Sequence, residues 1–329
     1  MTNSLVVGVD AGATSTRVAV HALDGTRVGY ARAGAGNPTA HGLAKAVGAI
    51  AEALGQALGS HDGSRVVASL AGVAGTVEAL KPELAKVWGE HGITVGPRVT
   101  GDVPIAYVAG SPAPEGALLL SGTGAVAARI SGFQLAAIAD GLGWLLGDEG
   151  SGFWIGREAA RAAVAALDRR TAEDPTGGAP EGAAGGAATG MLVELVVEHF
   201  LGAERGPTPR KDADRVVRLA QADHMRLAAL SALVSRAAAE GDPLALDIVR
   251  RAAGHLVATV RRVHVSGPVV LAGSVLTSEG PVREAVRELL GDVTVTTAQD
   301  GAGAAAWLAA RALLDPREAE ELHPRFVGP

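Results

Sequence analysis

Short apolar runs separated by turn signals open the chain. Residues 5–10 form an apolar run that ends in the carboxylate of Asp10, residues 17–21 form a second, and Asp24-Gly25 separates it from a third at 28–31. Together they predict a three-stranded meander. The next predicted elements are helices at 41–58 and 77–91 and strands at 65–70 and 98–100. Strands first, then alternating helices and strands, indicate an α/β unit with a mixed sheet.

A similar pattern begins near Gly116. Apolar runs at 117–120, 125–130 and 133–139, with a glycine turn after the first, predict a second meander, so we expect the two halves to be a diverged structural repeat. The later predicted elements are helices at 151–167, 191–201, 212–219, 225–240, 243–255, 281–290 and 301–314 and strands at 269–272 and 293–297. Residues 171–190 predict a mobile loop or a small insertion, and the tail after Pro316 is expected to fray.

The length of the chain indicates about two domains. It has 329 residues, of which 48% are hydrophobic and 19% charged, which is more than one compact core of ordinary size requires. We expect the domains to span residues 1–115 and 116–329, the second with a helical insertion. The last predicted helix, at about 301–314, is expected to pack back on the first domain.

Charge and cysteine content exclude several classes of function. The formal net charge is −6, so no whole face attracts a polyanion, and nucleic acid is not an expected partner. Cysteine is absent, which excludes disulfides, thiolate zinc sites, cysteine-ligated iron–sulfur clusters and cysteine nucleophiles. We find neither a signal peptide pattern nor an apolar run long enough to cross a bilayer. We therefore expect a cytoplasmic protein without a membrane partner.

Glycine turns between apolar runs carry the first candidate chemistry. In Asp10-Ala11-Gly12-Ala13-Thr14-Ser15-Thr16-Arg17, small residues let backbone amides approach a phosphate, and hydroxyl groups add donors. Asp10 is suited to hold Mg²⁺ through water. Ser121-Gly122-Thr123-Gly124 repeats the arrangement, so the two turns are predicted to hold the phosphates of a nucleotide from both sides of a cleft. The alternative for each is an ordinary β-turn.

Three further segments combine strand ends with polar or glycine residues. Asp102 is placed to accept a proton from an attacking hydroxyl, although its spacing alone favours a helix N-cap. The segment 140–152 holds five glycines and the acids Asp148 and Glu149, which are suited to sugar hydroxyls. Capping and a tight turn are the alternative. At Gly273-Ser274 a flat adenine could lie against the backbone, and an ordinary strand-to-helix turn explains the pattern equally well.

In this order the motifs resemble the N-acetylglucosamine kinase branch of the BadF/BadG/BcrA/BcrD ATPase family, within the actin-like superfamily of sugar kinases, chaperones and actin. The match runs from Leu5 to about Ala310 and is most specific at 147–157. The resemblance implies an α/β fold of two ribonuclease H-like (actin-like ATPase) domains with a cleft between them. It also implies an ATP- and Mg²⁺-dependent kinase of an amino-sugar 6-hydroxyl, with N-acetylglucosamine as the expected substrate, and a homodimer.

The resemblance also assigns residues. For ATP it implies Gly12, Thr14, Ser15, Thr16, Thr123, Gly124, Gly273 and Ser274, and for the sugar it implies Asn37, Asp102, Gly122, Thr123 and Asp148. Asp102 is the implied catalytic base, and Asp10 is the implied Mg²⁺ residue.

The chain departs from the family pattern at several positions. Ala11 and Ala13 replace common glycines, and Ser15 replaces a common lysine or arginine. Leu142 stands where many relatives carry a tryptophan beside the sugar, and Trp144 follows two residues later. Alternatives therefore stay open: a kinase of glucosamine, N-acetylmuramic acid or another hexose, or a sensor that binds nucleotide and sugar without catalysis. The lack of cysteine disfavours dehydratase activators and the zinc-binding repressor and kinase family of the same fold.

Overall fold

The structure is a computed structural model that describes residues 4–75, 77–173 and 190–328. Residues 174–189, which make up most of the predicted loop at 171–190, lie outside the described residues. The helix before them extends to Glu173, beyond its predicted end at residue 167.

The described strands form two five-stranded sheets with the same topology. The first sheet contains β1 (Leu5–Ala11), β2 (Thr16–Ala22), β3 (Arg27–Ala33), β4 (Val66–Val73) and β5 (Arg98–Thr100), in the order β3-β2-β1-β4-β5. The second contains β6 (Glu115–Ser121), β7 (Ala125–Ser131), β8 (Gln134–Asp140), β9 (Val269–Ala272) and β10 (Val295–Thr297), in the order β10-β9-β6-β7-β8. In each sheet the first three strands form an antiparallel meander and the last two run parallel to its first strand. The predicted structural repeat is therefore confirmed.

Helices connect and cover the sheets. They are α1 (Pro38–His41), α2 (Leu43–Leu58), α3 (Leu80–Glu90), α4 (Asp102–Val108), α5 (Gly152–Glu173), α6 (Met191–Leu201), α7 (Pro209–Ala222), α8 (Met225–Ala239), α9 (Pro243–Arg261), α10 (Ser274–Thr277), α11 (Pro281–Leu290), α12 (Gly301–Ala310) and α13 (Pro316–Val327). The predicted helix at 41–58 is two helices, because Gly42 has φ +86° and interrupts the helical backbone.

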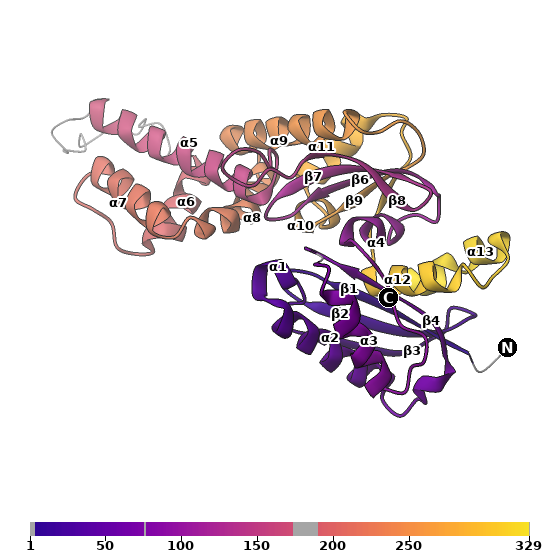
Figure 1. Cartoon of the computed structure of the whole chain (residues 1–329). Coiled ribbons are helices and arrows are strands. Elements are labelled where there is room, and N and C mark those ends of the chain that lie inside the picture. Colours follow the sequence, from indigo (N-terminus) through magenta and orange to yellow (C-terminus); the bar gives the residue numbers. More distant parts are fainter. Residues whose placement is uncertain (1–3, 76, 174–189, 329) are drawn as a thin grey trace.

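Other elements cover both faces of the central strands in each sheet (Figure 1). One face of the first sheet packs on α2 and α3, and one face of the second packs on α9 and the neighbouring helices. Between the sheets lie α4 and α12, whose apolar residues join the two remaining faces in one cluster. We call the first sheet with α1, α2, α3 and α12 the first lobe, and the second sheet with α5–α11 the second lobe.

Helix α12 lies directly against the first sheet, although it follows the last strand of the second. It packs on β1, β2 and β4. A methyl group at Gly8 of β1 would overlap the backbone of Ala302 and Ala306, so glycine is required for this close approach. The second sheet begins with β6 at Glu115, next to the division expected between residues 115 and 116; the domain division itself stays a prediction.

The expectation that the tail frays after Pro316 is wrong, because residues 316–327 form helix α13. Asp315 caps its start by accepting a hydrogen bond from the amide of Arg317 at 2.9 Å, and Pro316 occupies the first turn. The indole Nε1 of Trp307 donates a hydrogen bond to the carbonyl of Ala319 at 2.6 Å. The ring of Phe326 stacks on that of His21, with 4.8 Å between the ring centroids. The pair Asp315-Pro316 is a signal for the start of a helix that can be recognised in the sequence.

No helix formed by the described residues has both the length and the apolar character that crossing a bilayer requires.

Candidate active site

The carboxyl ends of the parallel strands carry the predicted site residues. In the first lobe β1, β4 and β5 run parallel, so their ends meet at one edge of the sheet, where ligands of α/β proteins bind. Asp10 is the penultimate residue of β1, and Asp102 follows β5. In the second lobe, the ends of β6 and β9 bring the turn at 122–124 beside Gly273.

Asp10 is a partly buried carboxylate beside one cation. Its Oδ2 lies 3.2 Å from Nη1 of Arg17, its partner in the β1–β2 register. Burial has the largest effect on the pKa of Asp10 and raises it. The charge of Arg17 lowers this pKa, and the charges of Asp102 and Asp300 raise it further. Asp102 therefore lies within electrostatic range of Asp10, although the two are far apart in sequence.

Asp102 occupies the first turn of α4. Gly101, and not Asp102, is the N-cap, and the Asp102 carboxylate lies near its own amide and that of Val103, at the start of the helix. Burial raises the pKa of Asp102, and the two backbone amides only partly oppose this shift. A carboxylate whose pKa is raised toward neutrality is a stronger proton acceptor while it stays ionised.

The turn between β1 and β2 is closed by its own backbone. The amide of Gly12 donates to the carbonyl of Ser15 at 3.0 Å, and the amide of Gly36 donates to the carbonyl of Gly12 at 3.0 Å. Thr14 is exposed and Ser15 is half-buried. The hydroxyl of Thr16 is fully buried beneath Gly36 and has no hydrogen-bond partner among the described residues. Thr14 and Ser15 are thus the hydroxyl residues of the predicted phosphate motif that a ligand can reach. Thr16 is buried and packs beneath the turn.

Asn37 follows Gly36, whose amide is hydrogen-bonded to Gly12 of this turn. Its Oδ1 accepts a hydrogen bond from the amide of Ala40 at 3.0 Å and caps α1. A methyl group at Gly75, which follows β4, would lie 2.6 Å from the same oxygen. The side-chain oxygen of Asn37 is therefore engaged, and its amide nitrogen is the group left for a ligand.

The turn between β6 and β7 is held by the start of α5. The amide of Gly122 donates to the carbonyl of Gly124 at 2.9 Å. The amide of Gly152 donates to the carbonyl of Gly122 at 2.7 Å, and that of Phe153 donates to the carbonyl of Thr123 at 3.3 Å. The amides of Thr123 and Gly124 have no backbone partner among the described residues, so they are the donors that this turn can offer to an anion.

Asp140 organises the loop that precedes α5. Its two carboxylate oxygens accept hydrogen bonds from the amides of Asp148 and Glu149, at 2.8 and 3.1 Å. Asp148 has φ +57°, is buried, and accepts a hydrogen bond from the amide of Gly143 at 3.2 Å; burial raises its pKa. Glu149 pairs with His255 at 2.9 Å. Of the two predicted sugar-binding acids in this loop, Asp148 faces the glycine turn, since a methyl group at Gly124 would lie 2.6 Å from its Oδ2.

A cavity of about 300 Å³ adjoins Ser274. Three polar groups that line it are Ser231 and Ser235 of α8 and Glu279 after α10. Gly273 has φ +79° and approaches the carbonyl of Ser121 so closely that a side chain would overlap it. Glycine is therefore required at 273 by the fold itself, and the serine-lined cavity is the space beside the predicted adenosine motif.

The structure thus gathers the predicted residues in two groups, one at the strand ends of each sheet. The first comprises Asp10, Gly12, Thr14, Ser15, Thr16, Asn37 and Asp102, and the second comprises Gly122, Thr123, Gly124, Asp148, Gly273 and Ser274. Helix α4, which begins at Asp102, packs on strands of both sheets and links the groups. Among the described residues no three histidine or acidic side chains form a ready metal site, but Mg²⁺ needs few carboxylates and keeps several waters, which the carboxylate of Asp10 fits.

Comparison with known proteins identifies the family of the chain. The model of one protein family, described as the BadF/BadG/BcrA/BcrD ATPase family, matches residues 7–309. The chain belongs to that ATPase family. The resemblance found from the sequence is thereby confirmed.

Relatives of this ATPase-family chain include sugar kinases. The N-acetylmuramic acid/N-acetylglucosamine kinase of Clostridium acetobutylicum is 38% identical over 72 residues, which are 22% of this chain and 24% of that protein. The chain thus matches about a quarter of that relative's length. The crystal structure of a candidate N-acetylglucosamine kinase from Chromobacterium violaceum is similar, with a TM-score of 0.64, 21% identity and coverage of 98% of this chain and 100% of the other. A ROK family glucokinase from Streptomyces griseus, in complex with glucose and AMPPNP, has a TM-score of 0.53 at 20% identity, covering 94% and 100%. These likenesses show that the predicted actin-like fold is correct.

Several residues of this family member were given no role by the sequence. Arg17 ends the first motif, yet its pairing with Asp10 depends on strand register. Asp140 directly precedes a glycine-rich loop, and an aspartate in that position commonly accepts hydrogen bonds from loop amides, as this one does. Ser231 and Ser235 are four positions apart on α8, and the spacing alone indicated that they share a helix face.

Proposed function

We propose that this protein is an ATP-dependent kinase that phosphorylates the 6-hydroxyl of an amino sugar, with N-acetylglucosamine as the first candidate. Membership of an ATPase family supports the use of ATP, and the named activities of the relatives support a sugar as acceptor. Glucosamine, N-acetylmuramic acid and related hexoses are the alternative substrates.

The observation that carries the proposal is the carboxylate of Asp102 in the first turn of α4, with a raised pKa and within range of Asp10. In the proposed reaction Asp102 accepts the proton of the sugar hydroxyl. The hydroxyl oxygen then bonds to the γ-phosphorus, and the bond to the bridging oxygen breaks, so that ADP leaves with the electron pair. Phosphoryl transfer needs mainly positioning and neutralisation of charge, which suits a site with one base and many amides.

The nucleotide is proposed to lie across both glycine turns. The free amides of Thr123 and Gly124 and the accessible Thr14 and Ser15 would hold its phosphates, with Gly12 and Thr16 shaping the first turn. Gly273, Ser274 and the cavity of about 300 Å³ beside them would hold the adenosine. Its size suits a flat base against backbone and serine hydroxyls.

Mg²⁺ is the proposed metal, held by Asp10 through water. When bound it would supply the charge neutralisation that the phosphates require. The ion pair with Arg17 keeps the Asp10 carboxylate in place, and the raised pKa of Asp10 reflects an acid whose charge the lobe only partly compensates.

The sugar is proposed to contact both lobes. Asn37 offers its amide nitrogen from the first, and Asp148 offers a carboxylate from the second, beside Gly122 and Thr123. Contacts to both lobes would let sugar binding draw them together around ATP, which excludes water from the transfer. An ATP-dependent reaction also favours the cytoplasm, where ATP is made available.

A homodimer is proposed through the edge of the second sheet. Strand β8 is seven residues long, uncharged before Asp140, and exposes Leu135 and Ile138. The edges at β5 and β10 have only three residues, and the β3 edge carries arginines at both ends of its strand. Natural proteins blunt free edges by such means, so an unblunted edge favours pairing with a second copy.

Replacement of Asp102 tests the proposal. Asp102→Ala is expected to abolish sugar phosphorylation, measured as ADP release over a sugar panel with product mass analysis, while ATP binding by calorimetry stays nearly unchanged. Turnover that persists within about tenfold of the wild type, or ~1.4 kcal/mol of barrier, would show that Asp102 is not the base. A wild-type protein that binds ATP and sugar but releases no ADP would instead identify a sensor.

A further inference from the structure

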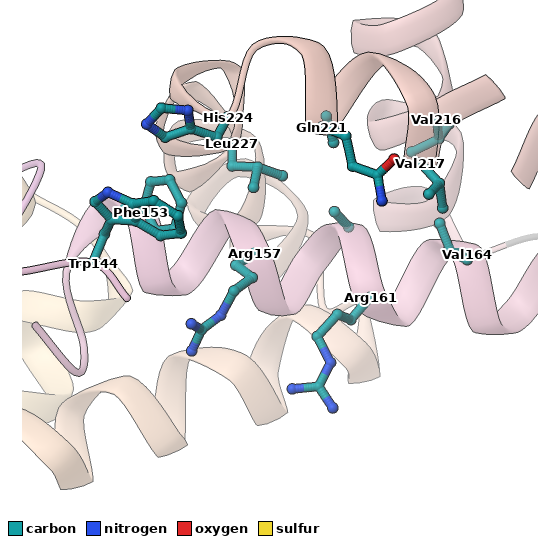
Figure 2. Close-up of a pocket in the computed structure, with 12 residues that line it drawn as sticks. Trp144, Phe153, Arg157, Arg161, Val164, Val216, Val217, Gln221, His224 and Leu227 are labelled. Atoms are coloured by element: carbon teal, nitrogen blue, oxygen red, sulfur yellow. The ribbon is translucent and has the colours of Figure 1, made fainter. Parts of the chain in front are cut away.

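A second cavity, of about 610 Å³, lies in the second lobe between α5, α7 and α8 (Figure 2). Its apolar walls are formed by Phe153, Ala160, Val164, Val216, Val217, Ala220 and Leu227. Trp144 and His224 lie at the end next to the start of α5, as Figure 2 shows. The function proposed above does not use this space.

The chemistry of the cavity suits an apolar group and not an acid. Arg157 and Arg161 line it with their aliphatic stems, but Figure 2 shows their guanidinium groups directed away from α7 and α8. Arg161 pairs there with Glu158 at 3.0 Å. Apolar atoms that leave water for such walls gain free energy in proportion to the area they bury.

The aromatic end of the cavity adjoins the proposed sugar site. Trp144 stands on the loop of Asp148, where the amide of Gly143 donates to the Asp148 carboxylate at 3.2 Å. Phe153, which lies 5.1 Å from Trp144 between ring centroids, donates its amide to the carbonyl of Thr123 at 3.3 Å. Phe153 at this end is thus hydrogen-bonded directly to Thr123, and Trp144 directly follows Gly143, which is hydrogen-bonded to Asp148.

Trp144 is the exposed tryptophan of the four in the chain. Its side chain stacks on His224 at 4.9 Å, yet the residue is 42% exposed, whereas Trp88, Trp154 and Trp307 are buried. A large, half-exposed aromatic ring at the mouth of an apolar cavity is suited to cover an apolar part of a ligand.

We propose that this cavity receives an apolar substituent of the sugar, so that the preferred substrates are amino sugars with an alkyl or aryl group on the nitrogen or the anomeric oxygen. The inference rests on the proposed kinase function. From Phe153 to Val164 the helix rises about 16 Å, enough to line an extended chain of several carbons. The methyl group of N-acetylglucosamine alone would leave most of this space unused.

The test compares matched sugars with the purified, full-length protein. N-acetyl-, N-butyryl- and N-hexanoylglucosamine vary the group on nitrogen, and hexyl N-acetylglucosaminide carries the chain on the anomeric oxygen. The value of kcat/KM is expected to rise by up to about fourfold for each methylene group that the cavity buries. A rise in only one of the two hexyl compounds identifies the position that faces the cavity.

Two variants on one helix separate the cavity from the surface. Gln221 is exposed and points toward the cavity in Figure 2, so Gln221→Trp is expected to fill it and to abolish the preference for hexyl over acetyl compounds. Arg218→Trp changes an exposed residue of α7 outside the lining and is expected to keep that preference. Equal preference in both variants would overturn the proposal.

Binding is measured independently of catalysis through Trp144. N-benzoylglucosamine is expected to change the tryptophan fluorescence of the wild type but not of Trp144→Phe. If no sugar is phosphorylated and this change persists, the kinase proposal falls and the cavity assignment stands. If N-acetylglucosamine is phosphorylated, longer substituents bring no gain, and the fluorescence does not respond, the cavity assignment falls alone.

Discussion

A single methyl group at Gly124 should displace the proposed sugar-binding carboxylate. The added carbon would lie 2.6 Å from Oδ2 and 3.3 Å from Cγ of Asp148, whereas ordinary contacts begin near 3.4 Å. Gly124 does not have a positive φ, so Gly124→Ala causes no backbone strain of its own. Asp148 must therefore retreat by about 0.8 Å.

The expected cost follows from this displacement. Misplacing a substrate-positioning group by about 1 Å can lower a rate by about 100-fold. We expect Gly124→Ala to lower kcat/KM for N-acetylglucosamine by about 10- to 100-fold, or roughly 1.4–2.7 kcal/mol, at saturating ATP. The measurement is coupled ADP release as a function of sugar concentration, with the KM for ATP determined in parallel.

A double-mutant cycle decides whether the effect acts through Asp148. In an Asp148→Ala background the methyl group meets no carboxylate, so adding Gly124→Ala should cost little more. A full additional loss in that background would refute the reasoning, because the methyl group would then act on the nucleotide directly. Gly254→Ala, in open space in the interior of α9, is the control for replacing glycine in the same lobe and should leave kcat/KM unchanged.

Two further predictions concern the base and the oligomer. Because burial raises the pKa of Asp102 in the folded protein, turnover should fall with pH at a point above that of an ordinary aspartate, as the base becomes protonated. The same shift destabilises the fold where Asp102 is ionised, so Asp102→Asn should raise Tm at neutral pH by an amount that vanishes as pH falls below the unfolded pKa; a lower Tm at neutral pH would contradict this. Ile138→Lys adds a charge to the exposed edge of β8 and should convert a dimer to a monomer in light scattering, whereas Arg32→Lys on the β3 edge should not. An unchanged dimer in Ile138→Lys would show that the copies meet elsewhere.

Much of the fold could be predicted because it follows from local patterns. The first strand of each meander is buried on both faces, and the turns of both meanders contain glycine, so three apolar runs sufficed in each half. Helix α13 escaped prediction because it contains Pro324 and buries only a few residues against other elements. Its stability depends on contacts with Trp307 and His21, which periodicity cannot show.

The sequence indicated which residues belong to the candidate site, but not how those residues lie relative to one another. Glycine turns and strand-end acids can be recognised along the chain, whereas the proximity of Asp10 to Asp102 and Asp300 arises from parallel strands and a returning helix. The burial of the Thr16 hydroxyl likewise depends on Gly36, which folds over it from another segment. Long-range packing of this kind leaves no local signal.

Because α12 packs on the first sheet, the first lobe cannot finish folding until almost the whole chain has been synthesised. Strand β1 is among the first segments made, yet the helix that covers Gly8 is completed only at Ala310. At ribosomal rates of about 5–20 residues per second, roughly 15–60 seconds separate the two. Throughout that interval one apolar face of the nascent sheet lacks its cover, so the amino-terminal half should depend on chaperones during synthesis and should not survive when expressed as a fragment.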